Sequence, residues 1–356
     1  MDFWNLETLW FALIAVLWLG YFFLEGFDFG VGTLLPFLAE DDVDRRVMIN
    51  TIGPVWDANE VWLLVAGGAT FAAFPEWYAT LFSGFYLALL LILLALIARG
   101  VAFEFRGKRD SDRWRARWDQ AIFWGSAIPA LLWGVAFGSI LRGTPIDASG
   151  EYVGSFFDLL HPYALLGGLM TLSLFTLHGA VFLTLKTEGE ITDRARAYAR
   201  RIWWPAAATT LGFLSWSYYT AATTGDRGIV PDFVPITALA AVLVVSWLLA
   251  ERLDGWAFLA TAGAIVLTMA TVFLNLYPRV MVSSIDPDFS LTIFNASSTT
   301  YTLTIMSWVA LAMTPVVIVY QAWSYWVFRK RVSREHFVGA ATVAGDEGAG
   351  EAEAGS

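Results

Sequence analysis

Long apolar segments separated by short polar breaks dominate the chain. Nine of them are long enough to cross, as helices, the hydrocarbon of a membrane, which is about 30 Å thick. They cover residues 9–37, 50–73, 77–99, 119–141, 160–185, 202–222, 232–250, 255–277 and 303–328. This pattern predicts an all-α integral membrane protein with nine transmembrane helices, contained in one transmembrane domain over residues 1–336.

The composition agrees with a membrane protein. Hydrophobic residues make up 57% of the chain and charged residues 15%, whereas soluble domains carry about 25% charged residues. The absence of cysteine excludes disulfides, iron–sulfur clusters, thiolate metal sites and covalently attached c-type haem. Part of the net charge of −10 comes from residues 337–356, whose Ala, Gly and Glu content predicts a disordered acidic cytoplasmic tail.

The basic residues predict the orientation in the membrane. Of the 22 Lys and Arg residues, 19 fall in alternate loops and in the segment after the last span. Those segments are residues 38–49, 99–118, 186–201, 251–254 and the tail from 329. Arg142, Arg227 and Arg279 are the basic residues on the opposite side. Because cytoplasmic loops carry the excess of Lys and Arg, the N-terminus is expected outside and the C-terminus in the cytoplasm.

A faint internal duplication is also present. Leu24-Glu25-Gly26 in the first segment has a counterpart in Leu177-His178-Gly179 in the fifth, and each segment leads to a charged loop containing Asp-Arg. This similarity predicts parallel repeats over residues 1–142 and 158–277, each a four-helix bundle, with residues 303–328 as a peripheral ninth helix. Apolar segments also resemble one another by chance, so the absence of a true repeat stays an alternative.

Two pairs of acids interrupt the apolar segments. Glu25 and Asp28 lie in the first segment, and Asp57 and Glu60 lie in the second. Helical spacing of three places the members of each pair on one face. A carboxylate exposed to hydrocarbon costs several kcal/mol, so such acids are expected to face a protein interior or a wet cavity.

The predicted topology brings these acids to a common depth. Asp28 and Asp57 fall about 10–15 Å inside the cytoplasmic boundary, with Glu25 and Glu60 one turn deeper. Arg99 closes the third segment and is expected nearer the surface. Three neighbouring helices would thus offer carboxylates at two levels with a guanidinium at the mouth, which suits a proton path. The simpler alternative is that the acids meet headgroup water or lock helices together as ion pairs.

The histidines limit the cofactors that this chain could ligate. The chain has three, of which His161 lies at the edge of the fifth segment, His178 inside it, and His336 in the tail. No second histidine lies at a spacing that would complete a bis-histidine haem site with His178. We therefore expect no metal or haem iron ligand in this chain, and a buried polar role for His178.

Several motifs in fixed order resemble subunit II of the cytochrome bd quinol oxidases. They are Gly26-Phe27-Asp28-Phe29-Gly30, Trp56-Asp57-Ala58-Asn59-Glu60, Ala73-Phe74-Pro75, Leu177-His178-Gly179-Ala180 and the stretch from Arg99 to Arg106. The resemblance implies an obligate heterodimer with subunit I in the bacterial cell membrane. Such a complex oxidises quinol and reduces dioxygen to water. It takes its protons from the cytoplasm and so builds a membrane potential in aerobic respiration.

The resemblance also implies a division of labour. Haems b and d are carried by subunit I, and this chain, not catalytic alone, scaffolds that subunit and contributes to proton uptake. The family's motif residues map to Asp57, Asp28 and Arg99. A structural quinone or a lipid is an expected ligand, small single-helix accessory subunits are further partners, and no nucleic acid is expected.

Two alternatives compete with this interpretation. Secondary transporters, including proton-coupled ones, are also built from repeats with charges near the midplane. Transporters of that kind carry broken helices in equivalent positions of both halves. Here Gly53-Pro54 lies near a helix start and the second half offers only Trp204-Pro205. The other alternative is a purely structural membrane subunit whose acids anchor a partner.

Overall fold

The computed structural model describes residues 5–224 and 228–337. The predicted acidic tail, apart from Phe337, lies outside the described residues. The helices are α1 (Leu6–Leu38), α2 (Asp42–Ile52), α3 (Trp56–Ala73), α4 (Pro75–Gly84), α5 (Tyr86–Phe105), α6 (Asp112–Arg142), α7 (Pro162–Lys186), α8 (Glu190–Thr224), α9 (Phe233–Ala250), α10 (Asp254–Leu276) and α11 (Thr300–Val327). Short 3₁₀ turns η1 (Arg106–Lys108), η2 (Phe156–Leu159) and η3 (Pro287–Phe289) and the antiparallel strands β1 (Arg279–Met281) and β2 (Leu291–Thr292) complete the described fold.

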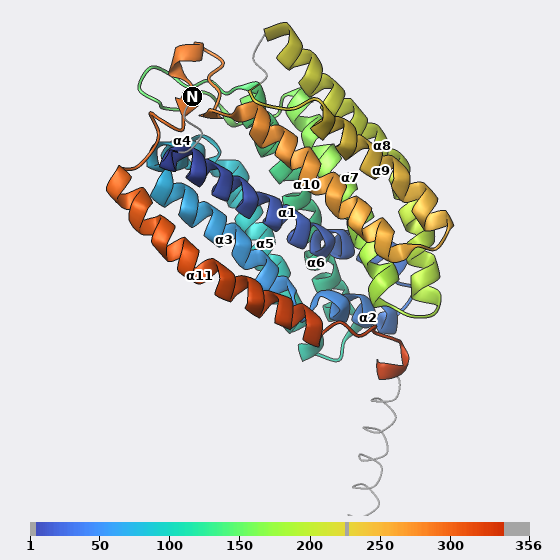
Figure 1. The fold of residues 1–356 in the computed structure, drawn as a ribbon. Coiled ribbons are helices and arrows are strands. Elements are labelled where there is room, and N and C mark those ends of the chain that lie inside the picture. The colour runs from blue at the N-terminus through green and yellow to red at the C-terminus, as the bar shows by residue number, and fades with distance from the viewer. Residues whose placement is uncertain (1–4, 225–227, 338–356) are drawn as a thin grey trace, which may run out of the picture.

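The structure is a mostly helical membrane-type fold, as the hydrophobic pattern predicts (Figure 1). Among the described residues, seven helices are long and apolar enough to cross a membrane: α1, α5 with η1, α6, α7, α9, α10 and α11. The predicted spans 50–73 and 202–222 fall in α3 and α8, which are helical but are not among those seven. The count of nine spans therefore stays a prediction.

Two predicted helix boundaries are wrong. The segment 50–73 is broken at residues 53–55, because Pro54 has no N–H with which to continue α2 and a new helix starts at Trp56. The segment 77–99 is divided between α4 and α5, which meet at Phe85, and α5 continues to Phe105. The membrane-crossing stretch that corresponds to the third predicted segment is thus Tyr86–Lys108, which begins and ends nearer the C-terminus than residues 77–99.

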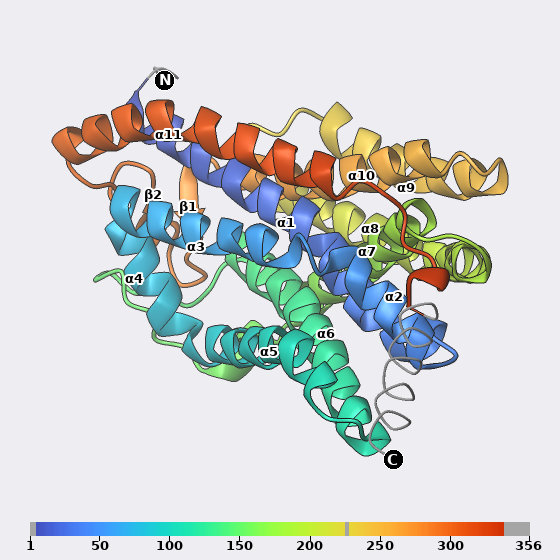
Figure 2. The same cartoon turned by 90° about the horizontal axis from the view of Figure 1, so that it is seen from below.

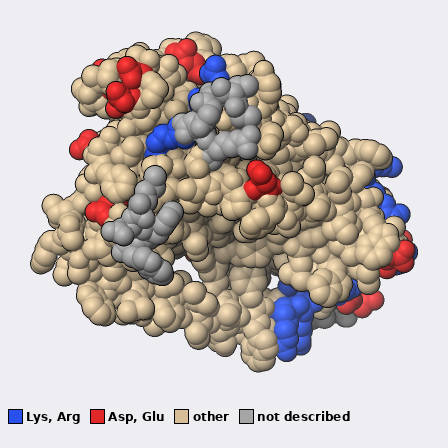
Figure 3. All heavy atoms as spheres, turned by 45° about the horizontal axis from the view of Figure 1, so that its top comes forward, with Lys and Arg blue, Asp and Glu red and all other residues tan. Residues whose placement is uncertain are grey.

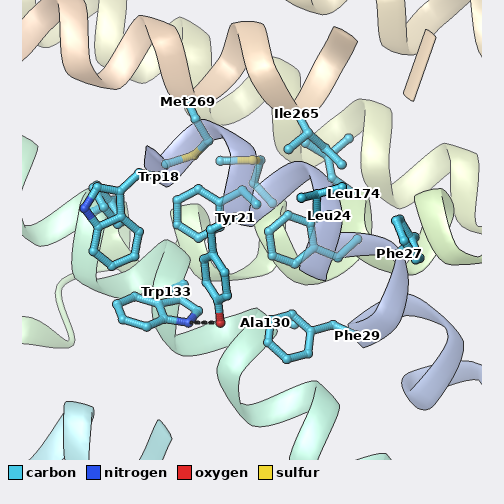
Figure 4. Packing of buried hydrophobic residues seen from close by; sticks show 14 of the residues in the cluster. Trp18, Tyr21, Leu24, Phe27, Phe29, Ala130, Trp133, Leu174, Ile265 and Met269 are labelled. Carbon is cyan, nitrogen blue, oxygen red and sulfur yellow. Dashed lines mark hydrogen bonds between the residues drawn. The ribbon is translucent and has the colours of Figure 1, made fainter. Parts of the chain in front are cut away.

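Helix α1 is the central element and packs against α3, α6, α7 and α10 (Figures 1 and 2). Aromatic side chains fill the space around it, including Trp18 and Tyr21 of α1 and Trp133 of α6 (Figure 4). Where α1 crosses α7, Gly30 and Gly179 bring the two backbones into contact. A Cβ on Gly30 would lie 2.0 Å from the carbonyl oxygen of Phe175, so this crossing requires glycine.

Helix α11 lies along the outside of the bundle, beside α3 and α1 (Figure 2). Leu303 is its buried residue. Polar contacts attach it at both ends: Trp10 Nε1 donates to the Leu303 carbonyl at 3.1 Å, and Trp62 Nε1 donates to Gln321 Oε1 at 2.8 Å. A ninth helix outside two repeats, and the division of the other helices into those repeats, stay predictions.

The segment after α11 crosses the end of the bundle that holds α2. We call residues 328–337 the strap. The Val332 N–H donates to the Lys186 carbonyl at 2.7 Å, and Lys186 Nζ donates to the Phe328 carbonyl. Arg334 pairs with Asp41 at 2.6 Å and also with Asp44. The hydrogen bond from Arg334 holds the pKa of Asp41 below its usual value. The strap thus ties α11 to the loops that follow α1 and α7.

Candidate functional site

The intramembrane acids of α1 lie deep inside the bundle. Glu25 and Asp28 are both 0% exposed. Arg99 of α5 donates a hydrogen bond from Nη1 to Glu25 Oε1, and both side chains of this ion pair are fully buried. Asp28 is buried within this chain itself, where Asn59 of α3 contacts it.

The predicted position of Arg99 near the membrane surface is wrong. Because α5 extends to Phe105, Arg99 lies within that helix, and its guanidinium sits 4.8 Å from the Phe29 ring centre and 5.6 Å from that of Phe103. Gly125 of α6 makes room for it, since a Cβ at that position would lie 2.6 Å from Arg99 Cβ. The aromatic rings add cation–π attraction to the ion pair.

The two acids of α3 have different surroundings. Glu60 Oε2 lies 3.8 Å from Arg99 Nη1, and the Glu60 side chain is 20% exposed. Asp57, in the first turn of α3, is exposed. The structure thus brings Glu25, Asp28, Glu60 and Arg99 together and leaves Asp57 on the surface one turn away from Glu60.

Sequence analysis missed three polar partners of this site. Asn59 is fully buried and donates from Nδ2 to Asp28 Oδ2 at 2.7 Å. Its Oδ1 accepts from the Tyr325 hydroxyl at 2.7 Å and from Gln321 Nε2 at 3.3 Å. In the sequence, an asparagine between two acids of an apolar segment could have indicated that Asn59 belongs to this polar site. Nothing in the sequence indicated that α11 would supply Gln321 and Tyr325.

The cluster contains polar atoms that the described part of the chain leaves without a hydrogen bond. They are Glu25 Oε2, Asp28 Oδ1, Glu60 Oε2, and Nε and Nη2 of Arg99. Since buried polar groups are nearly always hydrogen-bonded, ordered water is the expected partner of several of these atoms. Glu25 and Glu60 share one guanidinium, and Asp28 lies one turn from Glu25 on α1, so the cluster has the groups needed to hold and pass on a proton.

His178 lies on α7, where its ring packs against Phe23 and Phe27 of α1. It is fully buried, its Nδ1 is 2.7 Å from Thr261 Oγ1, and its ring stacks on Phe258 with centres 4.6 Å apart. It lines neither of the two main cavities. Within residues 5–224 and 228–337, no three His, Cys, Asp or Glu side chains gather as metal ligands would. Among the described residues, Nε2 of His178 is buried without a hydrogen-bond partner, while Nδ1 and one face of the ring contact Thr261 and Phe258.

An apolar cavity of about 500 Å³ lies beside the cluster. Residues of α1, α3, α4, α5 and α6 line it, among them Trp18, Gly67, Trp77, Leu89 and Phe137. Its volume is in the range of small-molecule sites, and its walls suit a hydrocarbon chain.

Comparisons with known proteins agree on one family. The family described as "Cytochrome bd terminal oxidase subunit II" matches residues 6–328. The chain is 47% identical to "Cytochrome bd ubiquinol oxidase subunit 2" of Bacillus subtilis (strain 168) over 331 residues, which cover 93% of this chain and 98% of that protein. It is 37% identical to "Cytochrome bd-I ubiquinol oxidase subunit 2" of Escherichia coli (strain K12) over 372 residues, which cover 94% and 97% respectively.

A solved structure has a similar fold. A chain of the bd oxidase from Geobacillus thermodenitrificans matches with a TM-score of 0.74 and 18% sequence identity, covering 91% of this chain and 99% of that one. At this identity the match supports the fold alone.

Proposed function

Because the chain belongs to the family of cytochrome bd terminal oxidase subunit II, we propose that it takes up protons from the cytoplasm and scaffolds the haem-bearing subunit I. Membership of the family makes it a membrane-embedded part of a quinol oxidase complex in aerobic respiration. The finer roles are inferred from the residues. The observation that carries them is the buried cluster of Glu25, Asp28, Glu60 and Arg99.

The proposed proton route follows the gradient of burial along α3 and α1. A proton enters at Asp57, which is exposed, and passes to Glu60 one turn away. Glu60 and Glu25 contact the same Arg99 nitrogen, so ordered water beside that guanidinium would join the two carboxyl groups. Glu25 is the deepest acceptor on this route, and Asp28, held in place by Asn59, lies one turn of α1 nearer to the α2 end. Arg99 balances the negative charge and keeps the carboxyl groups close together.

The route runs inward from the end of the bundle that holds α2 and the strap. Asp28 lies ten residues before Leu38, a rise of about 15 Å along α1. We propose that this end is cytoplasmic, since 18 of the 22 basic residues lie in its helix ends, loops and tail, Arg99 being buried within α5. The N-terminus would then lie outside.

Subunit I would cover the surface that contains Asp57. On α3 this acid is exposed together with Val61 and Leu64, so a charged group stands beside apolar side chains that face a membrane. A carboxylate in that position is costly unless a protein partner or water surrounds it. A partner subunit over α3 would enclose Asp57 while keeping a wet connection to the cytoplasm.

The haems of the complex are assigned to subunit I, and the chain alone is proposed to be non-catalytic. Bound in subunit I, the haems would supply electron transfer from quinol and the reduction of dioxygen. This chain would deliver protons and hold the partner. The apolar cavity next to α3 and α5 would take the tail of a structural quinone or lipid.

The replacement Asp57→Asn tests the proton route in the assembled oxidase. Asparagine keeps the size of the side chain but cannot carry the exchangeable proton. We expect oxygen consumption to fall at least about tenfold, which corresponds to ~1.4 kcal/mol of added barrier. Haem content and assembly should stay normal. Oxygen uptake with excess quinol measures the effect.

Glu76→Gln is the matched control, since Glu76 is an exposed acid in the first turn of α4 at the opposite end of the bundle. Its oxygen consumption should be unchanged. Normal turnover of a fully assembled Asp57→Asn variant would remove Asp57 from the route. Loss of haem or of subunit I before any loss of turnover would instead favour a purely structural subunit.

A further inference from the structure

Helix α11 is apolar and exposed over most of its length, yet it presents two polar side chains to α3. Gln321 and Tyr325 lie four residues apart, one turn of the helix, and both are half-buried. Figure 3 shows that most of the surface in view carries no Lys, Arg, Asp or Glu, as expected for a molecule surrounded by lipid. An amide in such surroundings is costly unless it is hydrogen-bonded, so the partners of Gln321 indicate its role.

The two side chains both donate to one oxygen of Asn59. Gln321 Nε2 lies 3.3 Å from Asn59 Oδ1, and the Tyr325 hydroxyl donates to the same oxygen at 2.7 Å. Because two donors occupy its oxygen, the Asn59 amide presents Nδ2 to Asp28, where it donates to Oδ2 at 2.7 Å. Asn59 is fully buried, so the orientation of its amide depends on these protein partners.

The direction of this chain of hydrogen bonds is determined by Trp62. An amide can turn over and exchange its donor and its acceptor, and a hydroxyl can donate or accept, so neither Gln321 nor Tyr325 alone fixes the orientation of Asn59. An indole N–H only donates, and the Trp62 ring packs against α1 at Gly20, where a Cβ would lie 2.3 Å from it. Trp62 Nε1 donates to Gln321 Oε1 at 2.8 Å, which leaves Gln321 Nε2 to face Asn59. The indole thus orients Gln321, and Gln321 orients Asn59.

This orientation determines which oxygen of Asp28 is available to a proton. Oδ2 accepts from Asn59, whereas Oδ1 has no hydrogen-bond partner among the described residues. A proton that reaches this carboxyl group therefore binds at Oδ1. If the Asn59 amide were reversed, its oxygen would face Asp28 Oδ2, and a proton would be held between the two oxygens instead.

We propose that three positioning residues keep the Asn59 amide oriented so that Asp28 receives and releases its proton at Oδ1. They are Trp62, Gln321 and Tyr325. This inference rests on the proposed place of Asp28 in the proton route. The alternative is a purely adhesive role, in which the polar side chains only hold α11 against α3, as polar groups between membrane helices often do.

Infrared spectroscopy of the assembled oxidase reads the surroundings of Asp28. Its carboxyl bands, protonated or ionised, are identified by subtracting the spectrum of the Asp28→Asn variant, whether or not that variant turns over. We expect these bands to shift in Gln321→Met and in Tyr325→Phe, since each removes one donor to Asn59 Oδ1. The control Tyr320→Phe removes an exposed hydroxyl from the same helix and should leave the bands unchanged.

Two further measurements separate positioning from adhesion. In an Asn59→Leu background, neither replacement should shift the Asp28 bands further, because the amide through which both act is gone. Proton uptake by the reduced oxidase after mixing with oxygen should slow about fivefold in either variant, the factor expected for the loss of one hydrogen bond.

Unchanged Asp28 bands in the variants that assemble, or a further shift in the Asn59→Leu background, would overturn the proposal and leave α11 with an adhesive role. Gln321→Met and Tyr325→Phe remove different groups, so either one keeps the test decisive if the other impairs assembly. Shifted bands with proton uptake at the unmodified rate would support the positioning of Asp28 and contradict the proposed proton route.

Discussion

At the scale of single residues, Arg99 is the group on which the candidate site depends. It contacts Glu25 and Glu60 and lies over the ring of Phe29, all inside the bundle. A buried ion pair is weak evidence for stability, because desolvation offsets much of the attraction. Removing only one partner of the pair is strongly destabilising, since the other charge then stays buried without compensation.

The replacement Arg99→Met should therefore destabilise the complex by about 3–5 kcal/mol. Thermal unfolding of the assembled oxidase measures this effect, with the dissociation of the subunits as the readout. The double variant Arg99→Met with Glu25→Leu should recover much of the stability, because it removes both charges. Equal destabilisation by the single and double variants would contradict a dominant role for the uncompensated carboxylate.

The sequence predicted four of the charged residues that gather, but it did not predict that Asp57 stays on the surface, nor the depth of Arg99, nor all of the polar partners. Glu25, Asp28, Glu60 and Arg99 do meet, because helical spacing and alternating topology determine their approximate heights. The link from Asn59 to Tyr325 could not be predicted, because the two residues are 266 positions apart and their contact depends on which helix lies beside α3.

At the scale of elements, the crossing of α1 and α7 positions both acids of α1. Phe175, Gly179 and Gly30 form a contact in which backbone meets backbone. The pair Gly26 and Phe175 forms the next contact along α1, where a Cβ would lie 2.9 Å from the phenyl ring. A glycine pair in two apolar segments is a recognisable packing motif, although the sequence cannot say that these two segments meet.

We expect Gly30→Ala to destabilise the complex by about 1–3 kcal/mol, because the new methyl group must push the two backbones apart. Gly263→Ala in α10 is the matched control, since a Cβ there has nothing within 4 Å. Thermal unfolding of the two variants side by side gives the comparison. If both variants are equally stable, the close crossing is not a determinant of the fold.

The two misplaced helix boundaries have different causes. Pro54 is a recognised helix breaker, so the division between α2 and α3 was accessible from the sequence. The junction of α4 and α5 at Phe85 follows only Ser83-Gly84, a weaker turn signal within the mainly apolar residues 77–99. The hydrophobic pattern alone therefore placed the end of the third span at Arg99, whereas the helix continues to Phe105.

At the scale of the whole molecule, contacts between distant segments close the bundle around the acid cluster. The strap joins α11 to the loops after α1 and α7, and α11 in turn contributes Tyr325 to the network that holds Asp28. Charge patterning predicted the membrane orientation that we propose. It could not predict the strap, which depends on specific pairs such as Arg334 with Asp41.

The central claim is that the buried carboxyl groups of this chain carry protons to the oxygen-reducing subunit. Proton uptake by the reduced, assembled oxidase after mixing with oxygen, recorded with a pH indicator dye, tests it most directly. The informative variant is Glu25→Gln, which keeps the shape of the side chain but cannot carry the exchangeable proton. The control Glu188→Gln changes an exposed acid in the loop after α7. We predict that Glu25→Gln slows proton uptake at least about tenfold, with normal haem content and an unaffected control. Proton uptake at the unmodified rate in the fully assembled Glu25→Gln oxidase would contradict the account.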